Sequence, residues 1–198
     1  MRPTATVLGG FRHPVHDSQR VFRGVLDAMA HPGRIVGLDA VVATAAPLYR
    51  GTMALLLALT DLETPLWLSP SADNDAVLGA IRFHCGSPIV ADPSRAAFAV
   101  AANAAERPRL DALDLGSDLY PERAATLILQ VDGLGVGREI VLAGPGIDGT
   151  ARLAVDGLDE AFWIERKALE ILFPRGLDVI LVDGEAVATV PRSTAVEA

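Results

Sequence analysis

Three arginines and one histidine lie beside turns or at the predicted end of a helix, where side chains can meet a ligand. Arg34 and Arg192 lie beside turns that contain proline. Arg82 and His84 lie at the predicted C-terminal end of a helix. The planar guanidinium group matches the geometry of carboxylates and phosphates, so the three arginines, together with His84 at the same helix end as Arg82, are candidate ligand-binding residues for a phosphate-like anion. Cations at a helix C-terminus also offset the helix dipole, so a purely structural role for Arg82 and His84 stays open.

The segment Gly133-Leu134-Gly135-Val136-Gly137 is the stretch most similar to a nucleotide-binding loop. A dinucleotide loop leads into a helix whose N-terminus meets the phosphate, whereas here a strand is predicted to follow. We therefore interpret the glycines as a hairpin connection between strands predicted over residues 126–131 and 139–143. The sequence has no Walker lysine pattern and no Gly-x-Ser-x-Gly elbow.

Metal and Schiff-base chemistry find little support in the residue pattern. His13 and His16 are close enough in sequence to share a metal, but no cysteine stands near them, so we interpret both as part of a solvated arm. Lys167 is the sole lysine and is predicted to lie on the outer face of a helix. The sequence therefore predicts no catalytic residue, no metal site and no cofactor.

The bulk composition is that of one globular domain spanning residues 1–198, with residues 1–16 as a loose N-terminal arm: 51% of the residues are hydrophobic and 21% are charged. The net charge of −8 argues against a nucleic-acid partner or an anionic membrane surface. Cys85 is the sole cysteine, so no internal disulfide can form and a reducing cytoplasm is expected. The longest apolar run, residues 53–59, is too short to span a bilayer.

The elements that must position these side chains are organised around a C-terminal hairpin. Residues 177–182 are nearly all apolar, as in a strand that is buried on both faces. Asp183-Gly184 is predicted to form the turn, and the return strand over 185–190 ends at Pro191. The order of elements indicates an α/β three-layer sandwich with a mixed sheet. The predicted helices cover residues 17–30, 47–60, 75–84 and 159–172, with a short one near Leu110, and the other strands cover 34–38, 66–68, 89–90, 96–100, 126–131 and 139–143.

Several short segments, taken together and in this order, resemble the H subunit of the bacterial carbon–phosphorus lyase system for phosphonate use. None of them is a catalytic motif, and the resemblance rests on their joint order. Members of the family can end Pro-Arg-Thr-Thr-His, whereas Ser193, Thr194 and Ala195 follow Pro191-Arg192 here. The matching segments are Phe22-Arg23, Ala28-Met29, Pro32-Gly33, Asp61, residues 64–68, Asn74-Asp75, residues 82–84, residues 126–131, Gly144, Gly146-Ile147, Phe173-Pro174, Gly176, Asp178 and Pro191-Arg192.

This resemblance implies a fold similar to that of the pyridoxal-phosphate-dependent transferases, but without the cofactor lysine and without the cofactor. It implies a homodimer that joins the G, I and J subunits in a core complex. The system supports formation of α-D-ribose 1-methylphosphonate 5-triphosphate from ATP and methylphosphonate, with displacement of adenine. The resemblance assigns no catalytic residue to the H subunit.

Three functions follow as hypotheses. The first is a non-catalytic assembly subunit, because no nucleophile–base pair can be identified in the sequence. The alternative is a phosphonate- or nucleotide-binding subunit, in which Arg34, Arg82, His84 and Arg192 hold phosphonate or the triphosphate of ATP. The third is an unrelated α/β binding domain. A mean hydropathy of +0.34 and the strand edge expected at the end of the hairpin also favour a homodimer.

Overall fold

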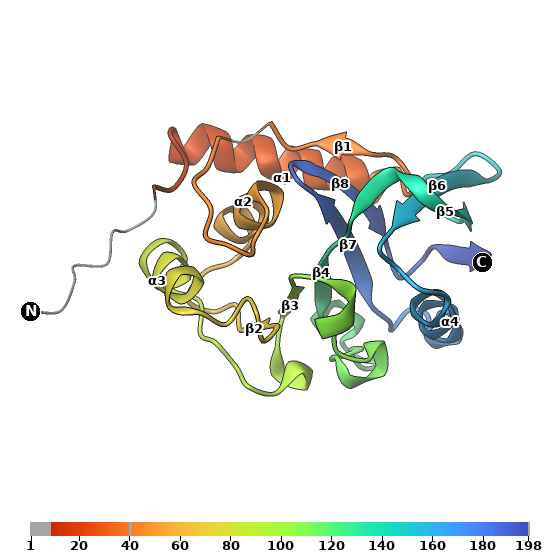
Figure 1. Ribbon diagram of the computed structural model, residues 1–198. Helices are drawn as coiled ribbons and strands as arrows, with labels where there is room; N and C mark the ends of the chain where they lie inside the picture. The colour runs from red at the N-terminus through yellow and green to blue at the C-terminus, as the bar shows by residue number, and fades with distance from the viewer. Residues whose placement is uncertain (1–8, 40, 198) are drawn as a thin grey trace, which may run out of the picture.

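A six-stranded mixed sheet runs through the centre of the computed structural model, which describes residues 9–39 and 41–197 (Figure 1). In spatial order its strands are β1 (Val36–Gly37), β8 (Ala186–Val190), β7 (Asp178–Asp183), β4 (Thr126–Gln130), β3 (Phe98–Ala101) and β2 (Leu66–Leu68). The four strands from β7 to β2 are parallel, β8 is antiparallel to β7, and β1 is antiparallel to β8. The predicted α/β class and mixed sheet are therefore confirmed.

Each face of this sheet has its own hydrophobic core, because successive residues of a strand point to opposite faces. Ile128 of β4 joins the core beneath three helices, whereas its neighbours Leu127 and Leu129 join the core on the other face. The three helices are α1 (Pro14–Ala30), α2 (Arg50–Leu59) and α3 (Asp75–His84). The other face is covered by a second, antiparallel sheet and one helix (Figure 1): β6 (Ala151–Asp156), β5 (Gly133–Ala143), β9 (Ala195–Glu197) and α4 (Glu160–Ala168).

The first helix begins earlier than predicted. Proline is tolerated at the first helical position because its missing N–H would have no helical partner there. α1 accordingly begins at Pro14, and the Asp17 carboxylate accepts a hydrogen bond of 2.8 Å from His13 N. The prediction of a loose arm up to residue 16 is therefore wrong for Pro14 to His16, and residues 1–8 lie outside the described residues.

The second helix, in contrast, begins later than the predicted Pro47. Leu48 N donates to Ala45 O in a turn, and Tyr49 N donates to the side chain of Gln130. The chain is therefore tied to the end of β4 before it becomes helical at Arg50.

The glycine-rich segment is not the hairpin connection that the sequence suggested. Gly133 begins β5, which lies in the second sheet, whereas β4 lies in the first. β5 pairs with β6, which the sequence did not predict, and the register shifts between Leu134 and Arg138 as in a β-bulge. Gly137 takes a φ of +86°, and a Cβ there would lie 2.7 Å from Val155 O, so the bulge requires glycine.

The C-terminal hairpin is close to its prediction, with a shift of one residue at the turn. β7 is buried on both faces as expected, and Asp183 pairs with Ala186, so the turn residues are Gly184 and Glu185. The predicted free edge of the return strand is partly wrong, because β1 pairs with β8 at Val187. After β8 the chain adds β9 to the second sheet, which the sequence also did not predict.

The remaining differences are small. The strand predicted over 89–90 is a single bridge between Ile89 and Leu66, and the helix predicted over 159–172 divides into α4 and a short 3-10 turn, Glu170–Leu172. The irregular part of the chain after β3 contains the 3-10 turns Ala104–Glu106 and Leu110–Ala112, the second where a short helix was predicted. Among the described residues no helix has the length and apolar content needed to cross a membrane.

Candidate functional site

A cavity of about 490 Å³ opens at the carboxyl ends of β3 and β4. In open α/β sheets, ligands bind in the crevice at this edge of the parallel strands, so this cavity is the candidate functional site. Its polar side chains come from the loop after β3, from the end of β4, and from the segment between β6 and α4. They are Asn103, Arg107, Gln130, Asp132 and Asp159.

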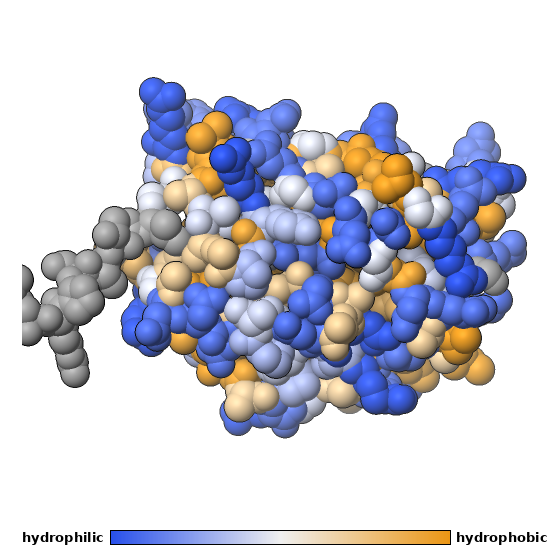
Figure 2. All heavy atoms as spheres, in the orientation of Figure 1, coloured by the Kyte–Doolittle hydropathy of each residue, from blue (hydrophilic) through white to orange (hydrophobic). Residues whose placement is uncertain are grey.

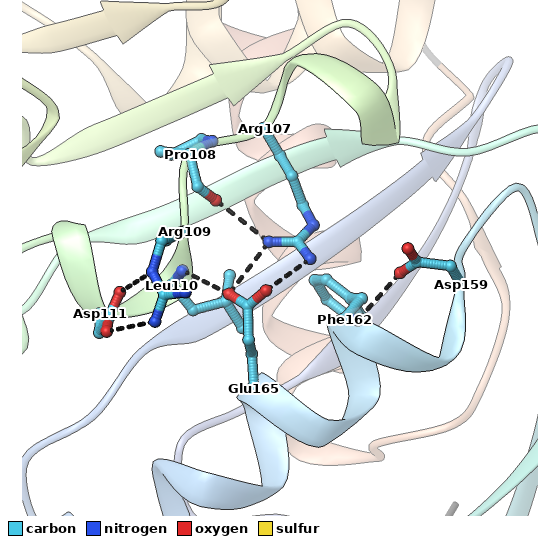
Figure 3. A network of polar contacts seen from close by, with 8 residues as sticks. All are labelled: Arg107, Pro108, Arg109, Leu110, Asp111, Asp159, Phe162 and Glu165. Atoms are coloured by element: carbon cyan, nitrogen blue, oxygen red, sulfur yellow. Dashed lines mark hydrogen bonds and ion pairs between the residues drawn. The ribbon is translucent and has the colours of Figure 1, made fainter.

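An ion pair between Arg107 and Glu165 of α4 forms one wall of the site (Figure 3). The two guanidinium nitrogens lie 2.9 and 3.1 Å from the two carboxylate oxygens, and Leu110 N donates to the same carboxylate at 2.9 Å. Arg107 also donates to Pro108 O and lies over the ring of Phe162, 5.2 Å from its centroid. Only 11% and 23% of the Arg107 and Glu165 side-chain surfaces are exposed.

The electrostatics of this wall favour the ionised carboxylate. Burial opposes the charge on Glu165, but the hydrogen bonds from Arg107 and Leu110 N outweigh burial and hold the pKa of Glu165 below its ordinary value. Beside this pair, the exposed Arg109 donates to Asp111 and lowers the pKa of that carboxyl (Figure 3). The positive charge of Arg107 is thus already matched by a carboxylate of the chain itself.

Gln130 forms the opposite wall, at the end of β4. Its residue surface is only 2% exposed, and its amide makes four hydrogen bonds to segments far apart in the sequence. Its oxygen accepts from Tyr49 N at 2.6 Å and from the Thr52 hydroxyl at 2.8 Å, and its nitrogen donates to Pro47 O and Ala102 O. Gln130 therefore joins the end of β3 to the beginning of α2, and all of its hydrogen-bonding capacity is used in the fold.

Two acidic residues hold the loop and helix that border the cavity. Asp159 caps α4 by accepting from Phe162 N at 3.0 Å (Figure 3). Glu106 accepts from the backbone and the hydroxyl of Ser71, at 2.9 and 2.7 Å, which ties the loop after β3 to the loop after β2. Hydrogen bonds from Ser71 lower the pKa of Glu106 to about 2. These carboxylates are structural partners of neighbouring backbone and hydroxyl groups.

Asp132 differs from the other polar residues of the site. Its side chain is exposed and makes no hydrogen bond with a described residue. The carboxylate lies against Gly157, where a Cβ would come within 2.7 Å of Oδ2 and where φ is +86°. Asp132 is therefore free to meet a polar group in the cavity.

The four residues predicted from the sequence do not line one cavity. Arg82, His84 and Arg192 each line a different one, of about 360, 760 and 160 Å³. Arg34 is exposed and lies 3.3 Å from Asp27, and Arg192 is paired with Asp178 and donates to Pro121 O. Arg82 and His84 are adjacent only in the sense that they share the last turn of α3.

The histidines and the lysine that the sequence singled out lie on or beside helices, with His13 directly before α1. His16 is on the first turn of α1, and Lys167 is exposed on α4 as predicted. Within residues 9–39 and 41–197, no three potential metal ligands come together.

Sequence reasoning missed both walls of the cavity, although two local signals were present. Asn103 and Glu106 have the spacing of a helix cap, and the Asn103 side chain does accept from Glu106 N at 3.0 Å. Gln130 is a polar residue at the end of an otherwise apolar strand, which indicates a buried hydrogen-bonding group. No local signal connects Arg107 with Glu165, because 58 residues separate them.

Comparison with known proteins agrees with the resemblance drawn from the sequence. A family model described as "Bacterial phosphonate metabolism protein (PhnH)" matches residues 9–197. The subunit PhnH of α-D-ribose 1-methylphosphonate 5-triphosphate synthase from Rhizobium meliloti (strain 1021) is 36% identical over 189 residues, which cover 96% of this chain and 94% of that protein. HtxG of Stutzerimonas stutzeri, provisionally named a C-P lyase subunit protein, is 34% identical over 190 residues, which cover 89% and 84% of the two chains. This chain therefore belongs to the PhnH family of bacterial phosphonate metabolism proteins.

Proposed function

We propose that this chain is a subunit of the carbon–phosphorus lyase complex, in which α-D-ribose 1-methylphosphonate 5-triphosphate is formed during phosphonate catabolism. The observation that carries the proposal is the 36% identity, along almost the full length of both chains, to a protein named as a subunit of that synthase. We further propose that it forms a homodimer and assembles with the G, I and J subunits in the cytoplasm.

Within the complex we propose an assembly role without catalytic residues. The support is that Arg107 and Gln130, two of the polar groups at the carboxyl ends of the parallel strands, are engaged by the fold itself. Arg107 is neutralised by Glu165, and the Gln130 amide has all four of its hydrogen bonds satisfied internally. A group that is to stabilise reacting charge must be available to it, and these groups are not.

Co-expression of the G, I and J subunits with and without this chain tests the assembly role. We expect the complex not to assemble when the chain is omitted. Size-exclusion chromatography with mass measurement detects this loss. If the three subunits assemble equally well without the chain, and activity then depends on adding it, the assembly role is contradicted.

The alternative of a ligand-binding subunit is favoured by one observation, at the end of α3. Arg82 is exposed and makes no ion pair with a described residue, and it lines its cavity together with Ser87. The Ser87 hydroxyl is buried and has no hydrogen-bond partner among the described residues. A free guanidinium beside a free hydroxyl could bind a phosphonate or a phosphate of ATP. Calorimetric titration with ATP or methylphosphonate distinguishes the ligand-binding role from the assembly role. In the ligand-binding role Arg82→Ala weakens binding, whereas the matched control Arg95→Ala, at another exposed arginine, does not.

We also propose that the fold is related to that of the pyridoxal-phosphate-dependent transferases. The four parallel strands with an antiparallel neighbour support this, and the exposed Lys167 is consistent with a chain that lacks the cofactor. Superposition on a transferase of that class would contradict the proposal if the order of the central strands did not match.

A further inference from the structure

Helix α1 carries two separate apolar faces. Val21, Val25 and Ala28 are buried in the core beneath the helix layer. A second set of apolar side chains is exposed to solvent, with 80% of the Val15 surface and 51% of the Leu26 surface accessible. An amphipathic helix at a protein surface needs only one apolar face, so the second face requires an explanation.

The exposed set has the spacing of a helix–helix seam. Its positions are three and four residues apart in alternation, which is the heptad spacing that lets a second helix pack along the first. Val15, Phe22 and Leu26 are exposed (Phe22, for example, to 46%), whereas Met29 is partly buried and also packs against the core beneath the helix. The seam consists of Val15, Gln19, Phe22, Leu26 and Met29.

The seam borders a groove and not a flat surface. A cavity of about 760 Å³ lies between the N-terminal half of α1, the chain at Gly10 and Phe11, and the ends of α2 and α3. Its far wall is formed by Leu57 and Ala58 of α2 and by His84 of α3. Val15 and Phe22 of the seam line the same cavity. An apolar groove of this form receives an amphipathic helix.

The outer rim of the seam is basic, although the chain has a net charge of −8. Arg20 and Arg23 line a neighbouring hollow together with His13 and His16. In Figure 2, hydrophilic side chains surround a small apolar patch over the N-terminal part of α1.

The two acidic residues of α1 compensate Arg20 but not Arg23, because Asp17 forms an ion pair with Arg20 alone. Asp17 is buried and accepts from His13 N, with Arg20 3.7 Å away, and Asp27 is paired with Arg34. Arg23 makes no ion pair with a described residue. The rim is therefore complementary to negative charge.

We propose that this groove binds an acidic amphipathic helix of another subunit, with the partner's apolar side resting on the seam and its acidic flank along the basic rim. This inference rests on the proposed function, since it assigns a surface for assembly. A second copy of this chain fits less well, because antiparallel pairing of two α1 helices would set basic rim against basic rim. A lipid surface fits less well too, because a chain with a net charge of −8 is repelled by anionic membranes.

The test uses the complex obtained by co-expressing this chain with the G, I and J subunits. Phe22→Glu places a negative charge in the seam, and Arg23→Glu reverses the charge at one position of the basic rim. Each should weaken binding of the chain to the other subunits by about tenfold or more, as for a residue at the centre of an interface. Ile171→Glu, at an 88% exposed apolar position outside the groove, and Arg95→Glu are the matched controls and should bind normally.

A photo-crosslinking residue at position 22 identifies the occupant. A cross-link to an acidic helical segment of another subunit supports the proposal, whereas a cross-link to a second copy, or retention on anionic vesicles that Phe22→Glu abolishes, overturns it. Circular dichroism confirms that the variants fold, and Val15→Glu replaces Phe22→Glu if that variant does not. If the unmodified chain fails to join the complex, the proposed function itself is contradicted. Normal joining by Phe22→Glu and Arg23→Glu contradicts only the groove.

Discussion

Replacing Glu165 with methionine tests whether its ion pair with Arg107 holds the wall of the cavity. The change leaves a largely buried guanidinium and Leu110 N without their acceptor. Breaking a buried pair costs about 3–5 kcal/mol, whereas an exposed pair contributes at most about 1 kcal/mol. With 11% and 23% of the two side chains exposed, the pair lies nearer the buried limit. We therefore expect the free energy of unfolding to fall by about 2–3 kcal/mol.

Urea unfolding measures this change, with tryptophan fluorescence as the signal because Trp163 is fully buried beside Phe162. Arg107→Met and the double variant complete a mutant cycle. Removing both charges leaves neither unpaired, so the double variant should lose about 1–2 kcal/mol less than the sum of the single variants. Arg109→Met, which breaks only an exposed pair, is the control and should cost less than about 0.5 kcal/mol.

The pH dependence provides an independent check. Because the folded state lowers the pKa of Glu165, its stabilising contribution is present above the ordinary carboxyl pKa and is lost as the pH falls through the lowered value. The difference in unfolding free energy between the wild type and Glu165→Met should therefore shrink below about pH 4. Strict additivity in the cycle, or a difference that does not change between neutral and acidic pH, would refute the reasoning.

Gln130→Leu should lower the free energy of unfolding by about 2–4 kcal/mol in urea, because Tyr49 N and the Thr52 hydroxyl lose their acceptor, and a loss below about 1 kcal/mol would contradict this. The pKa of Glu106 is lowered to about 2, so its contribution to the free energy of unfolding is lost as the pH falls from about 4.5 toward that value. Glu106→Gln should therefore reduce the fall in stability over this acidic range, and the same fall in the wild type and the variant would contradict this. If the ligand-binding alternative holds, Arg82→Ala should weaken ATP or methylphosphonate binding about tenfold in calorimetry, and unchanged affinity would exclude that role for Arg82. Sedimentation velocity should show a dimer, and a concentration-independent species at the monomer mass of 20.8 kDa would exclude it.

Elements with a local signature could be predicted from the sequence alone. Asn74 caps α3 by accepting from Ala76 N and Val77 N, and the helix runs over the predicted residues. The apolar run in β7 predicted burial on both faces, and burial on both faces is observed. These patterns depend on residues two to four positions apart, and such spacings decide local structure directly.

The assignment of strands to sheets was decided only by tertiary structure. The strand after Gly133 looks like the partner of β4 when the chain is read in order, yet β5 pairs with β6 and β9 in the second sheet. The same short apolar pattern is compatible with either partner, because a strand's own residues specify its faces but not its neighbours. The register between β5 and β6 shifts between Leu134 and Arg138, and such a bulge bends the strand where it occurs.

The candidate site was likewise beyond the sequence. Arg192 was predicted as a candidate anion ligand, and the sequence did not show that it forms an ion pair with Asp178 of β7, because only the pairing of β7 with β8 brings the two together. Arg107 meets Glu165 because the loop after β3 and helix α4 lie against the same face of the sheet. Residue types show which groups can carry charge or donate a hydrogen bond. Which of those groups remain available to a ligand depends on long-range packing, which no local spacing encodes.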